Sequence, residues 1–134
     1  MNAAYIKLFG EIARTINLLS ERVMEANHLI NDEHGEQTAQ IMRDDYAQLH
    51  DRLMQDNFDP KTLTKQDYAK ILVGVMVVVN NLKDRIENQQ KAIDNYQLQI
   101  APKLQRIIDE CSNDEEAFNL ANELFTIDET NNWL

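Results

Sequence analysis

The chain contains few of the residues that interrupt regular secondary structure. Its 134 residues include three glycines and two prolines. Sandwiches and barrels need turn signals about every 8–12 residues, and most of those signals involve glycine or proline. The scarcity of both residues argues against an all-β fold and favours long helices.

Cysteine and long apolar runs are also scarce. Cys111 is the only cysteine, which excludes an internal disulfide and a cysteine-rich zinc site. The most apolar stretch, residues 71–79, is far shorter than the ~20 residues of a membrane-spanning helix. Lys7, Glu11 and Arg14 interrupt the apolar N-terminal region before a signal-peptide core can form. We therefore expect a cytoplasmic protein without membrane contact.

Lys and Arg are fewer than Asp and Glu, and the excess negative charge is distributed unevenly along the chain. Lys and Arg number 13 against 23 Asp and Glu, a formal net charge of −10, which argues against direct nucleic-acid binding. Residues 1–108 hold 15 acids against 13 bases, a net of −2. Residues 109–134 hold the remaining eight acids and no Lys or Arg. The C-terminal fifth therefore carries −8 of the −10.

Apolar residues recur at alternating spacings of three and four, which brings them to one face of a helix. The first such stripe predicts a helix over residues 3–30, followed by a polar connection in which Gly35 takes a left-handed conformation. The second predicts a helix over residues 36–55. The residues of the first stripe are Tyr5, Phe9, Ile12, Ile16, Leu19, Val23, Ala26 and Ile30.

The longest stripe predicts a third helix over residues 65–100, with Thr64 and Asp67 as its N-terminal capping pair. Pro102 should end or kink this helix, and a short C-terminal helical pair follows, with Ser112 and Glu115 as a capping box. The fold class expected is all-α: an elongated helical bundle in one domain, with coiled-coil-like heptad seams.

The seam of the third helix has two interpretations. It is either the core of a monomeric bundle or a self-association surface, and the length of the helix predicts a homo-oligomer, most simply a dimer. A polar residue within the seam, Gln89, sets the register in the second interpretation or lies where the seam reaches solvent. The candidate self-association residues are Leu72, Val75, Val79, Leu82, Ile86, Gln89 and Ile93.

The sequence offers little support for catalysis or metal binding. Glu25 and His28 have the Glu-x-x-His spacing of helical di-iron proteins, but those proteins use two such pairs and this chain has one. Acidic neighbours of Cys111 should raise its pKa and leave the thiol inert. We therefore expect no catalytic residue, no cofactor and no metal.

The acidic C-terminal segment, residues 109–134, interleaves carboxylates with aromatic residues. Its apolar side chains either dock on the bundle or form an acidic-aromatic surface for a protein partner with a basic surface. The candidate partner-binding residues are Glu115, Glu116, Phe118, Glu123, Phe125 and Trp133.

The function expected is a non-enzymatic protein–protein interaction module, acting as an adaptor, regulator or inhibitor. The alternative is an acidic nucleic-acid mimic that blocks a nucleic-acid-binding protein. A helical-bundle, metal-dependent enzyme is the weakest reading, because one Glu-x-x-His pair supplies too few ligands.

Overall fold

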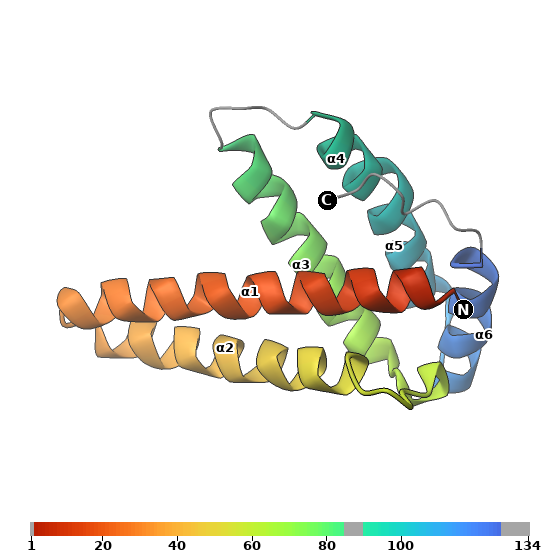
Figure 1. The fold of residues 1–134 in the computed structure, drawn as a ribbon, viewed down its shortest axis with the longest axis horizontal. Coiled ribbons are helices and arrows are strands. Elements are labelled where there is room, and N and C mark those ends of the chain that lie inside the picture. Colours follow the sequence, from red (N-terminus) through yellow and green to blue (C-terminus); the bar gives the residue numbers. More distant parts are fainter. Residues whose placement is uncertain (1, 85–89, 127–134) are drawn as a thin grey trace.

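The fold is all-α in a computed structural model that describes residues 2–84 and 90–126. No strand occurs among these residues, which confirms the all-α class; the bundle and its coiled-coil-like seams stay predictions. In chain order the elements are α1 (Ala3–Leu29), α2 (Glu33–Leu53), η1 (Pro60–Thr62), α3 (Lys65–Lys83), α4 (Gln90–Asp94), η2 (Asn95–Ile100), α5 (Ala101–Glu110) and α6 (Asp114–Leu124). They pack as a long helical hairpin crossed by a third helix, with α4 and α5 running alongside that helix and α6 near the N-terminus (Figure 1).

The hairpin of α1 and α2 forms the long axis of the molecule (Figure 1). Its connection is shorter than expected, because Asp32 caps α2 by accepting a hydrogen bond from the Gly35 backbone N–H at 2.9 Å. Gly35 therefore lies in the first turn of α2, and the left-handed conformation belongs to Asn31, with φ 59°. The prediction for Gly35 was wrong because asparagine also tolerates this conformation.

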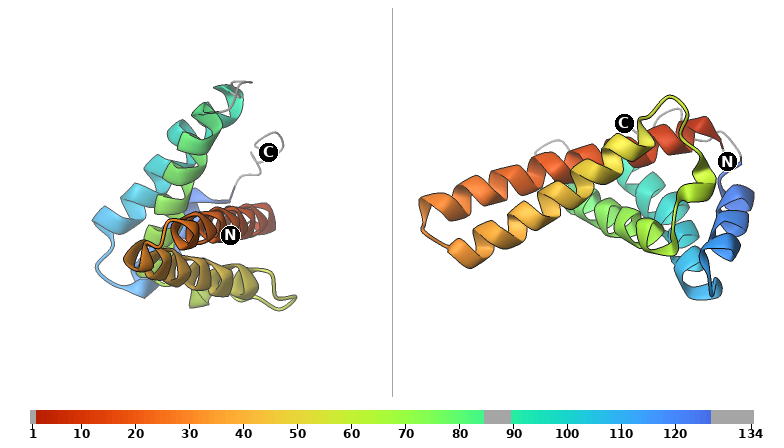
Figure 2. Two further views of the ribbon diagram at one scale, coloured as in Figure 1. Left: turned by 90° about the vertical axis from the view of Figure 1, so that its left-hand side faces the viewer. Right: turned by 90° about the horizontal axis from the view of Figure 1, so that it is seen from below.

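Helix α3 crosses one face of the hairpin near its base (Figures 1 and 2). The expected capping pair is present: Thr64 Oγ accepts from the Asp67 backbone N–H, and Asp67 accepts from the Thr64 backbone N–H. Gly74 brings the α3 backbone close to α1, since a Cβ built on it would lie 2.7 Å from Ile12 Cγ2. On the α2 side, the Tyr46 hydroxyl donates to the Lys70 carbonyl at 2.8 Å.

The expected continuous helix over residues 65–100 is wrong. Helix α3 ends at Lys83, and the chain returns beside it through α4, η2 and α5 (Figure 1). The spacing of the apolar residues does not reveal where the chain turns back, because residues on both arms of a helical hairpin pack against one core with the same spacing.

Pro102 does not end the returning helix, which continues through it. The six residues before α5 form a π-helix, η2, and Pro102 lies in the first turn of α5. Proline has no backbone N–H and crowds the preceding turn, and the wider π turn accommodates it.

The core extends from the base of the hairpin to α6, and the two ends of the described chain meet there. The ring of Phe125 lies 5.0 Å from Tyr5 and 5.2 Å from Phe9, measured between centroids. The Asn2 backbone N–H donates to the Phe125 carbonyl at 2.9 Å, and the Lys65 N–H donates to Asp114 Oδ1 at the same distance. The largest fully buried side chains are Tyr5, Tyr68, Phe9, Phe125, Ile12, Ile16, Leu63, Ile71, Ile93, Ile100, Leu104 and Ile107.

An ion pair between a buried carboxylate and a partly exposed arginine joins the end of α2 to the start of α3. Asp67 is 5% exposed and accepts from Arg52 Nη1 and Nη2 at 3.1 and 3.0 Å. Burial alone would raise the pKa of Asp67, but the hydrogen bonds from Arg52 and Thr64 outweigh it and leave the pKa below its usual value.

We expect this pair to make stability fall in acid. A carboxyl whose pKa is lower in the folded chain contributes stability above its unfolded pKa and loses it as pH falls through the folded value. Asp67→Asn lacks this contribution at every pH. Its free energy of unfolding, measured by urea denaturation from pH 7 to pH 2, should therefore fall less steeply with decreasing pH than that of the wild type. A loss of stability in acid as steep as that of the wild type would contradict this role of Asp67.

Candidate functional site

The outer part of the hairpin, residues 17–45, projects beyond the rest of the molecule (Figures 1 and 2). We call it the distal arm. The apolar stripe of α1 continues into this arm without a break, but there no other described element covers its residues fully. Ile16 is 1% exposed, whereas Val23 is 52% and Ile30 is 71% exposed. The same seam that builds the core at the base therefore faces solvent in the distal arm.

A groove of about 460 Å³ runs along the distal arm between α1 and α2. Helix α3 borders it through Val77. Ile41 and Val73 add exposed apolar side chains near its rim, since they lie three residues from Thr38 and four from Val77 on their helices. The lining residues are Ile16, Leu19, Ser20, Val23, Asn27, His34, Gly35, Thr38, Ala39, Met42 and Val77.

The groove is nearly uncharged, whereas the arm around it is acidic. Among the lining residues, His34 is the only ionisable side chain. Residues 17–45 carry seven carboxylates against two arginines, a net of −5. The groove therefore offers an apolar contact surface within a part of the chain that is negatively charged.

The sequence contains a signal for this site. The stripe of α1 continues through Leu19, Val23, Ala26 and Ile30, and α3, which crosses at an angle, covers only its first half. A stripe longer than the element available to cover it predicts an exposed apolar face.

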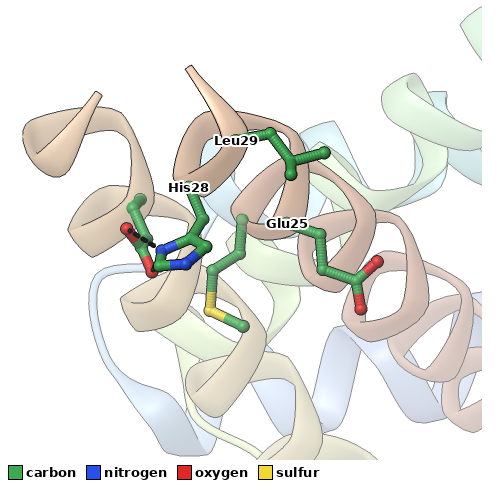
Figure 3. Close-up of a pocket in the computed structure, with 5 residues that line it drawn as sticks. Glu25, His28 and Leu29 are labelled. Carbon is green, nitrogen blue, oxygen red and sulfur yellow. Dashed lines mark hydrogen bonds and ion pairs between the residues drawn. The ribbon is translucent and has the colours of Figure 1, made fainter. Parts of the chain in front are cut away.

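A second hollow, on another side of the arm, contains the Glu25-x-x-His28 motif. His28 Nδ1 lies 3.2 Å from Glu36 Oε1. Figure 3 shows the Glu25 carboxylate directed away from the His28 ring. Within residues 2–84 and 90–126, no group of three or more His, Cys, Asp or Glu is placed to hold a metal ion. The two motif residues therefore do not act together, because His28 contacts Glu36 and Glu25 points elsewhere.

The acidic-aromatic surface expected on the C-terminal segment is not assembled as predicted. Phe125 is fully buried against Tyr5 and Phe9, so it cannot serve as a partner anchor. Phe118 is half-buried, with Lys61 Nζ 6.0 Å from its ring centroid. Trp133 lies outside the described residues. For Phe125, docking on the bundle is the correct interpretation.

The carboxylates of α6 remain exposed, and Glu116, like Asp114, accepts a hydrogen bond from a backbone N–H. Glu115 and Glu123 face solvent. Glu116 Oε2 accepts from the Ser112 backbone N–H at 2.8 Å, and this bond lowers the pKa of Glu116. Asn113, and not Ser112, caps α6 by accepting from the Glu116 N–H, which corrects the expected capping box.

The proposed self-association seam lies largely inside one chain. Val75, Val79, Leu82 and Ile93 are buried in the core. Leu72 is partly buried against that core. Ile86 and Gln89 lie outside the described residues. The prediction that the buried members form a self-association surface was therefore wrong, because these side chains already make their contacts within one chain. A homo-oligomer that forms through another surface stays a prediction.

Cys111 has no sign of activation. The thiol is buried, and burial raises its pKa, with Glu116 and Glu110 adding to the effect. A thiolate nucleophile needs the opposite environment.

No helix in the described part of the chain combines the length and apolarity needed to cross a membrane. Searches against family models, curated proteins and solved structures produced no match.

Proposed function

We propose that the protein is a non-enzymatic interaction module, an adaptor, regulator or inhibitor, that binds a protein partner with a basic surface through the distal arm. One observation carries the proposal. The apolar stripe of α1 passes from the buried Ile16 to the exposed Val23 beside an apolar groove. Contiguous apolar surface of this kind marks interaction sites in proteins of this size.

The energetics favour a partner on this surface. Each square ångström of apolar surface removed from water contributes about 25 cal/mol, so covering Val23 and the other exposed apolar side chains at the rim stabilises a complex. The net charge of −5 on residues 17–45 attracts a basic partner and speeds the encounter. A cytoplasmic location is part of the proposal, because Cys111 is a free thiol and fits a reducing compartment.

We expect Val23→Glu to weaken partner binding at least tenfold, which corresponds to ~1.4 kcal/mol. The substitution places a carboxylate on a surface that the partner covers, and burying an unpaired charge is costly. The partner is first identified by affinity capture from the native host with the wild-type chain. It is then purified and titrated against wild type and variant by calorimetry.

The matched control is Leu98→Glu. Leu98 is 69% exposed on η2, outside the distal arm, so it tests whether any new surface carboxylate weakens binding. Because both parent side chains are largely exposed, neither variant should change stability by more than about 0.5 kcal/mol, which urea denaturation checks. Equal binding by the wild type and both variants would overturn the proposal.

A further inference from the structure

We infer that the partner inserts a single amphipathic α-helix with basic flanks into the groove, along the distal arm. This inference rests on the proposed function and specifies the occupant of the same site. It follows from the length of the groove, the backbone chemistry of its walls, the way α3 packs on the hairpin, and the charge around the groove.

The groove has the length of a short helix. Along α1 its lining residues run from Ile16 to Asn27, and along α2 from Met42 back to His34. At 1.5 Å per residue the α1 side spans about 17 Å, or roughly three helical turns. An occupant of about 12 residues would therefore contact the groove along its whole length.

The walls favour a helix over an extended peptide. Both walls are helices, whose backbone groups are already paired within each helix. An extended peptide binds by adding to a sheet edge, and the described residues contain no strand. A helix satisfies its own backbone and needs only side-chain contact, which the groove supplies.

Helix α3 demonstrates how this face of the hairpin accepts a helix. Its Gly74 lies against Ile12 and Ile16, and its Val77 borders the groove. Farther out, the groove is lined by the small residues Ser20, Gly35, Thr38 and Ala39. Small side chains allow a second helix to approach closely, so the occupant would lie beside α3 on the same face.

Charge favours a basic partner over a second copy of this chain. Two distal arms would each bring a net of −5 to the contact, and the whole chain carries −10. Glu21, Glu25 and Glu33 form no ion pair with any other described residue. None of these three carboxylates lines the groove, so they act on Lys or Arg in the flanks of the incoming helix through the net field of the arm, which salt screens over a Debye length of about 8 Å.

The inference is tested with peptides, independently of the native partner. A random library of peptides of about 16 residues, displayed on phage, is selected on the wild-type chain and depleted on Val23→Glu. We expect enriched peptides with apolar residues at spacings of three and four and with excess Lys and Arg. A synthesised peptide should be helical when bound, by NMR, and should bind Val23→Glu at least tenfold more weakly but Leu98→Glu equally well.

A separate variant tests whether the carboxylates of the distal arm contribute to peptide binding. Replacing Glu21, Glu25 and Glu33 together with Gln should weaken peptide binding severalfold and flatten its dependence on salt. The Val23→Glu effect should persist in that background, because it arises from the apolar contact. An unchanged salt dependence would overturn the basic-flank assignment.

Other outcomes overturn the inference in distinct ways. Enriched peptides that lack the helical spacing, or the absence of any Val23-dependent peptide, would refute the helix. A dimer of the wild-type chain in sedimentation, lost in Val23→Glu, would assign the groove to a second copy. If the native partner depends on Val23 while the peptides refute a helix, the proposed function stands and this inference alone fails. If the native partner ignores Val23, the proposed function fails.

Discussion

Replacing Phe125 with alanine should lower the free energy of unfolding by about 3–4 kcal/mol, the largest effect we expect from a single truncation. The side chain is fully buried and packs on Tyr5 and Phe9, with centroid distances of 5.0 and 5.2 Å. Its removal leaves a cavity where the end of α6 meets the start of α1. Urea denaturation followed by circular dichroism measures the loss.

Phe118→Ala is the matched control, because Phe118 lies on α6, the helix that Phe125 caps, and is only half-buried. We expect it to cost about 1 kcal/mol, in proportion to the smaller area removed from water. If both variants lose equally little stability, the C-terminal segment is not docked through Phe125. In that case the side chain would again be available to a partner, as the sequence suggested.

Gly74→Leu should destabilise the chain by about 2–3 kcal/mol, because it places a side chain where two helices touch. A Cβ alone would lie 2.7 Å from Ile12 Cγ2 and 3.4 Å from Ile16 Cγ1. Both atoms belong to buried β-branched side chains, which have little freedom to move aside. Thermal and urea unfolding of the purified variant provide the measurement.

Two companion variants separate the close contact from helix propensity. Gly74→Ala gains about 1 kcal/mol of propensity against the same Cβ contact, so it should lose less stability than Gly74→Leu. Met76→Leu changes a 58% exposed residue on α3 and should be nearly neutral. Stability of Gly74→Leu equal to that of the wild type would show that α3 does not approach α1 as described.

Local signals in the sequence predicted individual helices well. The apolar stripe and the glycine and proline scarcity led to the all-α class, and Thr64 with Asp67 marked the start of α3. These features depend on residues within one or two turns of each other, so local chemistry determines them. The end of α3 at Lys83 was missed, since no glycine or proline occurs in residues 84–89 to signal it.

Tertiary contacts decided the rest. The stripe of the third helix and that of the distal arm look alike in the sequence, yet Val75 is buried and Val23 is exposed. The reason is geometric: α4, η2 and α5 fold back over α3, whereas α3 leaves the hairpin before reaching its tip.

The sequence by itself determined the all-α class, the position of α1, and the acidity of the chain, because composition and short-range periodicity suffice for these. The tertiary structure alone decided which apolar residues form the core and which line a groove. Periodicity places a residue on a helix face, but only the packing of distant elements determines whether that face is covered. Phe125 and Val23, one buried at the base and one exposed on the distal arm, differ for this reason.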